Sequence, residues 1–205
     1  MILVIAIAGA ALQTGAAVAH LALAQPSSTP QARAPLSFDG AELGMTVGEW
    51  KALPPPPGVE PTAAPDCGPA ILAALRDERI PVAAPAAGHT ICAYDARFGK
   101  DVLLHSGILD GRYQVEGLRY RFADGRLAEI DYTASIDAYN DIEAKLSRKY
   151  GRPVATVRDV LNTPAGHFPR VRQTWRTAGG VISLTDPTND PLRLGVRIAS
   201  VAAAH

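Results

Sequence analysis

Arginine recurs at alternate positions in several segments whose intervening residues are apolar, the spacing that places side chains on one face of a β-sheet. A guanidinium group can donate paired hydrogen bonds to a carboxylate or a phosphate. The sequence therefore predicts a single surface that binds an acidic protein, an anionic lipid headgroup or a phosphorylated glycan. Its candidate binding residues are Arg119, Arg121, Arg170, Arg172, Arg176, Arg193 and Arg197. The alternative is a solvated outer face of cross-strand ion pairs, such as Arg119 with Glu129.

Histidine chemistry is the second option that the residue types allow. His89, His105 and His167 stand at no fixed spacing from a serine, a cysteine or a paired carboxylate. Catalysis would therefore need the fold to bring His105 or His167 to a carboxylate. Because His89 and Cys92 alone are too few ligands for a metal and no glycine-rich phosphate loop is present, we predict no metal and no cofactor. A non-catalytic role is favoured over a small hydrolase.

The elements that would position Arg119 and Arg121 form a continuous segment from Val115 to Gly151. Leu118, Tyr120 and Phe122 alternate with the arginines, which indicates a half-buried strand. A three-residue loop, Ala123 to Gly125, predicts a hairpin with an apolar face that continues through Ala128, Ile130 and Tyr132. The predicted facing pairs are Phe122 with Arg126, Tyr120 with Ala128, Leu118 with Ile130 and Arg119 with Glu129.

A helix is predicted to follow, beginning near Ser135 or Asp137 and ending at Gly151, whose backbone can adopt the left-handed C-terminal cap. Its apolar stripe should pack across the hairpin. The stripe consists of Tyr139, Ile142, Leu146 and Tyr150.

The remaining arginines fall on predicted strands after this helix. We expect strands over 154–160, 171–176, 181–185 and 192–198, with Gly179-Gly180 as a hairpin turn. Before the hairpin we expect a short helix opened by a Thr46–Glu49 capping box, a helix over 69–76, and strands over 89–94 and 102–104. Trp50 and Trp175 have inward parity and are expected in the core. The fold class is α+β, an antiparallel sheet with helices packed on one face, and the order allows two helix-plus-strands repeats.

The N-terminal segment indicates export. Residues 1–24 contain no charged side chain and end in Ala22-Leu23-Ala24, which is typical of a cleaved signal peptide, although a positive n-region is missing. Residues 25–36 have the composition of a flexible linker, and 37–201 form the predicted single domain, with 37–134 and 135–201 as the halves of any duplication. Export would let the two cysteines, Cys67 and Cys92, form a disulfide. We expect a periplasmic or secreted protein, which would meet a membrane, if at all, only through an uncleaved N-terminus.

A formal net charge of zero in 205 residues argues against a nucleic-acid partner. The opening Leu43-Gly44-Met45-Thr46 and the later Lys149-Tyr150-Gly151-Arg152-Pro153 resemble small uncharacterised exported proteins of Gram-negative bacteria. The Leu-Gly-Met-Thr opening is also similar to outer-membrane assembly lipoproteins of the BamE (SmpA) type, which implies a binding module. The chain lacks that family's lipidated cysteine and carries Pro54 to Pro57 where the family has Gly-x-Pro, so no functional residue is carried over. The expected role is binding or envelope assembly, with an envelope protein or an anionic envelope component as partner. A small periplasmic hydrolase and a secreted inhibitor are the alternatives.

Overall fold

The computed structural model describes residues 36–60, 62–77, 85–98, 101–105, 107–109 and 111–203. Every described residue belongs to one compact unit, Ala32–His205. The predicted signal peptide, 1–24, lies outside the described residues, as does the predicted linker except Leu36. Leu36 is buried and belongs to the hydrophobic core.

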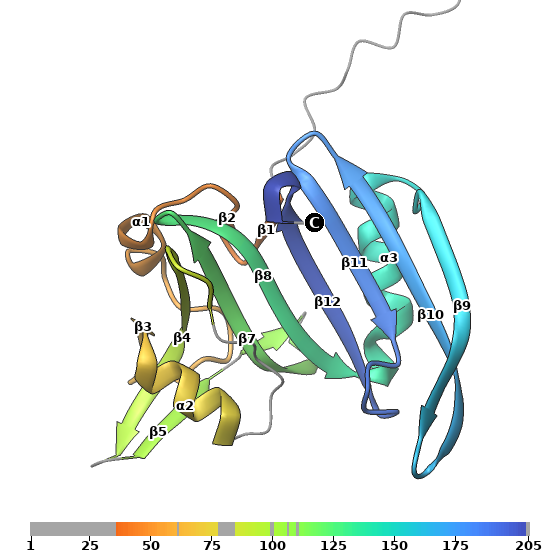
Figure 1. Cartoon of the computed structure of the whole chain (residues 1–205), viewed down its shortest axis with the longest axis horizontal. Coiled ribbons are helices and arrows are strands. Elements are labelled where there is room, and N and C mark those ends of the chain that lie inside the picture. Colours follow the sequence, from red (N-terminus) through yellow and green to blue (C-terminus); the bar gives the residue numbers. More distant parts are fainter. Residues whose placement is uncertain are drawn as a thin grey trace, which may run out of the picture. The chain divides into compact units, whose positions relative to one another are not determined.

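An antiparallel sheet dominates this unit (Figure 1). Along its main path the strands are β3 (Ala64–Cys67), β4 (His89–Phe98), β7 (Tyr113–Ala123), β8 (Arg126–Ser135), β12 (Arg193–Ser200), β11 (Gly180–Asp186), β10 (Gly166–Thr177) and β9 (Ala155–Thr163). In addition, β5 (Asp101–His105) pairs with β4, β6 (Ile108–Leu109) pairs with β7, and β1 (Ser37–Phe38) pairs with β2 (Ala41–Glu42). The helices are α1 (Val47–Lys51), α2 (Pro69–Asp77) and α3 (Tyr139–Tyr150), with 3-10 turns at Ile136–Ala138 and Val201–Ala203. The predicted α+β class is confirmed.

The turn between β7 and β8 is shorter than the sequence suggested. Asp124 and Gly125 both have positive φ angles, 49° and 75°, and Ala123 pairs with Arg126, so the loop has two residues. This is the geometry of a type I′ turn, which Asp-Gly favours because it matches the twist of the flanking strands. The predicted three-residue loop is therefore wrong.

The shorter loop and a β-bulge at Ala128 change the cross-strand partners. The predicted pairs of Phe122 with Arg126, Tyr120 with Ala128, Leu118 with Ile130 and Arg119 with Glu129 are wrong. The observed pairs are Phe122–Leu127, Arg121–Glu129, Tyr120–Ile130 and Arg119–Asp131. The predicted apolar face is nevertheless confirmed for Leu118, Tyr120, Phe122, Ile130 and Tyr132, which all belong to the main core cluster. In that cluster Leu127 takes the place that the prediction gave to Ala128.

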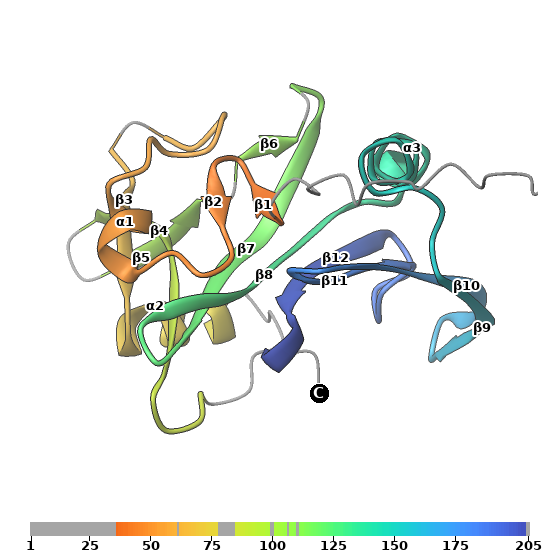
Figure 2. The ribbon, with the colours of Figure 1, turned by 90° about the horizontal axis from the view of Figure 1, so that it is seen from above.

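The helices α1 and α3 pack on this apolar face. The capping box at Thr46 and Glu49 is present, and it sets Trp50 of α1 against the rings of Tyr94 and Tyr120. α3 ends at Gly151 as predicted, and Ile142 joins the same core, with the rest of its predicted stripe partly buried against it. Figure 2 shows α3 on one side of the layer that contains β11 and β12. Within the described residues, no helix has the length and apolarity needed to cross a membrane.

The helix α2 lies on the other face of the sheet. Its Ile71 and Leu75 form a separate cluster with Ile91 and Ala93, which alternate along β4 with the core residues Cys92 and Tyr94. The expectation that all helices share one face is therefore wrong for α2. The predicted disulfide between Cys67 and Cys92 is present and joins β3 to β4 just before α2 begins. No observation tests an internal duplication, which stays a prediction.

Candidate functional site

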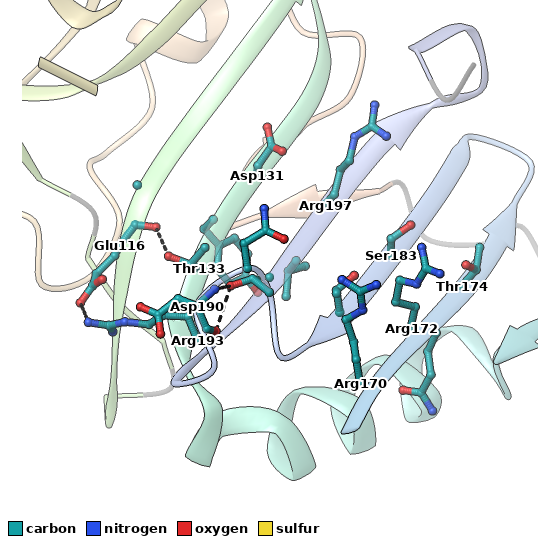
Figure 3. Close-up of a pocket in the computed structure, with 18 of the residues that line it drawn as sticks. Glu116, Asp131, Thr133, Arg170, Arg172, Thr174, Ser183, Asp190, Arg193 and Arg197 are labelled. Carbon is teal, nitrogen blue, oxygen red and sulfur yellow. Dashed lines mark hydrogen bonds and ion pairs between the residues drawn. The ribbon is translucent and has the colours of Figure 1, made fainter. Parts of the chain in front are cut away.

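A polar groove of about 960 Å³ lies on the face of the sheet opposite α3 (Figure 3). Its lining runs from Arg119 on β7 to Val157 on β9 and so crosses six strands. Five of the seven predicted arginines line it: Arg119, Arg170, Arg172, Arg193 and Arg197. Arg121 and Arg176 do not line the groove. The alternation read from the sequence thus places most of the predicted residues on one surface.

The floor of the groove consists of small side chains because of the register of the central strands. Ser183 on β11 faces Arg197 on β12 and Thr174 on β10. One step along, Thr185 faces Arg172 on one side and Gly195 on the other. The long arginine side chains therefore lie beside serine and threonine hydroxyl groups and beside Gly195, which has no side chain. The arginines and hydroxyls together offer many hydrogen-bond donors.

A side chain at Gly195 would interfere with one wall of the groove. A Cβ built there would lie 2.9 Å from the Cγ2 methyl group of Thr188, in the loop between β11 and β12. Asp190 of the same loop also lines the groove and accepts a hydrogen bond of 2.9 Å from the backbone N–H of Leu192. The loop therefore forms a rim of the groove, and it packs so closely on Gly195 that a larger residue at that position would clash with Thr188.

Each of the five groove arginines is within ion-pair distance of an acidic side chain, as the alternative interpretation of the sequence predicted. Arg193 Nη2 lies 2.7 Å from Glu116 Oε1. Arg119 Nε lies 3.4 Å from Asp131 Oδ2, so Arg119 pairs with Asp131 and not with Glu129. The other groove arginines share their carboxylates with a second arginine, which makes the two clusters described next. The surface is therefore a network of charges and not a row of isolated cations.

In the first cluster, the Asp159 cluster, one carboxylate serves two arginines. Arg170 Nε donates to Asp159 Oδ1 at 2.8 Å, and Arg172 Nη2 donates to Asp159 Oδ2 at 2.8 Å. Hydrogen bonding by Arg170 is the main cause that holds the pKa of Asp159 below its usual value. One carboxylate cannot neutralise two arginines, so the cluster keeps a net positive charge. The side chain of Arg170 is 21% exposed and that of Arg172 is 49% exposed, so Arg172 is the more accessible of the two cations.

The second cluster, the Glu129 cluster, repeats this arrangement with Glu129 between Arg121 and Arg197. Arg121 Nε lies 3.4 Å from Glu129, and Arg197 donates to Glu129 Oε2 through both Nε and Nη2. Burial is the largest single effect on Glu129 and opposes its ionisation. The hydrogen bonds and charge of Arg197, a hydrogen bond with Asp131 and the charge of Arg121 together outweigh it and lower the pKa of Glu129. Arg121 is 23% exposed and Arg197 is 46% exposed, and of these two only Arg197 lines the groove, whereas both arginines of the Asp159 cluster do.

Asp131 on β8 faces Arg119 on one side and Arg197 on the other, and its pKa is the most strongly shifted among the acids of the site. Its side chain is 14% exposed, and its Oδ2 atom has no hydrogen-bond partner. Burial raises the pKa of Asp131 to about 6, because Arg119 only partly offsets the cost and the nearby Glu129 adds to it. A carboxyl group on the groove wall therefore changes charge close to neutral pH.

The other residues singled out in the sequence lie away from the groove. Trp50 and Trp175 are buried in the core, as predicted. His167 is exposed near the tip of the β9–β10 hairpin, where its Nδ1 is hydrogen-bonded to Asn162, and the partly buried His89 begins β4. His105 ends β5, and its side chain lies outside the described part of the structure. In the described ranges, no group of three or more histidine, cysteine or acidic side chains could hold a metal ion.

Reasoning from arginine positions alone missed the acidic partners and the floor. Ser183 and Thr185 have the same parity on the strand between two arginine-bearing strands, and this signal was available in the sequence. Asp159 and Asp131 gave no such signal, because their roles depend on which strand lies beside theirs.

The chain was compared with models of known protein families, with curated proteins and with solved structures, and no match was found in any of the three comparisons. The resemblance to BamE-type lipoproteins and to small exported proteins therefore stays a prediction.

Proposed function

We propose that this protein is a non-catalytic binding module that takes an anionic partner in the groove on the outer face of its sheet. One observation carries the proposal. Two carboxylates, Asp159 and Glu129, each serve two arginines, and the more exposed arginine of each pair, Arg172 or Arg197, lines the groove together with Arg170. Each pair of arginines therefore carries more positive charge than its shared carboxylate. Arg197 also donates to the carbonyl oxygen of Ala203 through Nη2, so within the described residues the Nη1 groups of Arg172 and Arg197 are among the donors left for an incoming carboxylate or phosphate.

The dimensions of the groove favour an extended partner over a single small ion. Neighbouring strands are about 4.8 Å apart, so the five steps from β7 to β9 amount to about 24 Å. Arg172 and Arg197 lie on strands separated by β11, with Ser183 and Thr185 between them. A chain with at least two anionic groups would meet both arginines and could hydrogen-bond to the hydroxyls on the way.

The cellular setting is part of the same proposal. The predicted signal peptide over 1–24 supports export, and the Cys67–Cys92 disulfide supports an oxidising compartment. We place the module in the periplasm or outside the cell, where its partner is an envelope protein or an anionic envelope component. The hydrolase and inhibitor alternatives stay predictions.

The test uses fluorescently labelled polyglutamate as a simple extended polyanion. Binding measured by anisotropy should weaken as salt is added, and the variant Arg172→Glu/Arg197→Glu should lose at least tenfold in affinity. This double variant targets the two exposed cations and leaves Arg170, which makes paired hydrogen bonds to Asp159.

The matched control reverses two exposed charges that are remote from the groove, Arg148→Glu/Arg152→Glu, at the C-terminal end of α3 and just beyond it. Equal weakening by both double variants would mean that only net charge matters, and the groove proposal would be rejected. If the groove variant alone weakens binding, crosslinking of the chain in its native envelope should give linkages that cluster around the groove, and these linkages would identify the partner.

A further inference from the structure

The strand β9 is an edge of the sheet, because β10 is its only strand neighbour among the described residues. The β9–β10 turn has two residues, between the facing residues Thr163 and Gly166. Such a loop is closed by a hydrogen-bonded pair, so the odd-numbered residues of β9 bond to β10. Thr156, Arg158 and Val160 therefore direct their N–H and C=O groups away from β10, towards the free edge.

This edge also exposes valine side chains, on both faces of the sheet. Val154 is 61% exposed, Val157 is 48% exposed and Val160 is 53% exposed. They make up half of the six exposed large hydrophobic residues in the described ranges. Val154 directly precedes the strand, and its backbone N–H donates to the carbonyl oxygen of Thr174 on β10. The strand itself contains neither proline nor lysine, which commonly protect a free edge from pairing, and its charged residues are Arg158 and Asp159.

We propose that β9 pairs with β9 of a second copy of this chain, antiparallel, across a two-fold axis at Val157. Such an axis is perpendicular to the sheet, so facing residues must have the same parity. With Val157 facing itself, Val154 faces Val160 of the second copy, and the reverse pair follows by symmetry. All three exposed valines of each chain are then covered by valines.

The hydrogen-bonding phase agrees with this register. Thr156 faces Arg158 of the second copy, and both have their backbone groups directed outward, which is what a hydrogen-bonded pair requires. Val157 falls at a non-hydrogen-bonded position, where facing side chains are closest and a valine pair packs best. Ala155 faces Asp159 of the second copy, so no like charges stand opposite each other.

The neighbouring pairing registers of two β9 strands bring like charges together or leave valines without a partner. An axis at Arg158 would place Arg158 against itself, and an axis at Asp159 would place two carboxylates against each other. An axis at Val160 would leave Val154 and Val157 without a facing valine. The sequence of β9 thus selects one register out of those that geometry allows.

The groove supports the same arrangement. Val157 lines its β9 end, and the two-fold axis keeps both copies facing the same way. The two grooves would therefore meet at Val157 and form one continuous polar channel across the double sheet.

Cysteine crosslinking tests the register directly, because the wild-type chain has no free cysteine among its described residues. The test uses the whole chain with its own N-terminal segment. Val157→Cys should form a disulfide-linked dimer under mild oxidation, since the facing Cα atoms of a non-hydrogen-bonded pair are about 4.5 Å apart. Val160→Cys alone should stay unlinked, but should crosslink when mixed with Val154→Cys. Efficient linkage of Val160→Cys alone with none of Val157→Cys would overturn the register.

The solution state tests the interface itself. In sedimentation equilibrium the wild-type chain should show a concentration-dependent dimer, and Val157→Lys should shift it to monomer. Val201→Lys is the control, since Val201 is 54% exposed in the turn after β12, outside the edge. A wild-type chain that stays monomeric at its highest soluble concentration would refute the proposal, as would equal dissociation by both variants.

Discussion

Replacing Asp131 by Asn should stabilise the protein at alkaline pH and change its response to acid. Burial holds the pKa of Asp131 at about 6, above the usual unfolded value of about 3.9. A raised folded pKa means that the carboxyl group favours the folded state most when it is protonated. This contribution is fully present below about pH 4 and is lost as the pH rises through about 6.

The magnitude follows from the difference between the two pKa values. About 2 units correspond to a cost of about 3 kcal/mol for ionising Asp131 in the folded state at pH 8. At pH 4 most of this cost is absent, since the group is then largely protonated in the folded protein. The difference in unfolding free energy between Asp131→Asn and wild type should therefore grow by about 2 kcal/mol from pH 4 to pH 8.

Urea unfolding at a series of pH values measures this difference, and the buried Trp50 and Trp175 report it by fluorescence. Subtracting the two proteins removes the titration of groups that do not interact with Asp131 and leaves that of Asp131 together with its neighbour Glu129. Asp124→Asn at the exposed hairpin tip is the control and should follow the wild-type curve. If Asp131→Asn instead loses its advantage as the pH rises, then Asp131 is ionised and stabilising in the fold, and the reasoning about its burial is wrong.

Three further results are expected. Polyglutamate should bind more tightly as the pH falls below about 6, because protonation of Asp131 removes a negative charge from the groove wall, and Asp131→Asn should remove that dependence as measured by anisotropy. Reduction of the Cys67–Cys92 disulfide, which closes a loop with a sequence separation of 25, should lower the free energy of unfolding by about 3.5 kcal/mol in urea titrations. Thr46→Ala, which removes the capping box of α1, should cost about 1 kcal/mol in the same assay, whereas Thr46→Ser should cost much less.

Local signals in the sequence were sufficient for much of the fold. The end of α3 at Gly151 and the capping box at Thr46 depend on residues within one helical turn, and both are confirmed. The alternation of apolar residues with Arg119 and Arg121 depends only on strand geometry, so the buried face of the hairpin was also predictable.

The wrong predictions concern the length of the β7–β8 loop and the face of the sheet that α2 covers, where the local sequence is compatible with more than one structure. Ala123-Asp124-Gly125 allows a two-residue or a three-residue loop, and the bulge at Ala128 that accompanies the shorter one leaves no mark in the sequence. The face covered by α2 was not predictable either, since β4 carries apolar side chains on both faces and Ile91 could have pointed either way.

The site was predictable as a set of arginines but not as a network of charges. Arg197 meets Glu129 because β12 docks beside β8, a pairing between residues 68 positions apart. No local pattern states that two arginines will share one carboxylate. The distinction between a neutral surface and one with surplus positive charge depends on that sharing.

The groove crosses strands instead of running along one, and this has a kinetic consequence. Its walls come from β7 and β8 on one side and from β9 to β12 on the other, and the two groups meet only in the pairing of β8 with β12. Contacts of such high sequence separation form late, because the entropy of closing a long loop is lost before the contacts compensate for it. A chain still being synthesised, or one cut before β12, therefore has no groove to offer, and a partner that binds there recognises only molecules whose folding is complete.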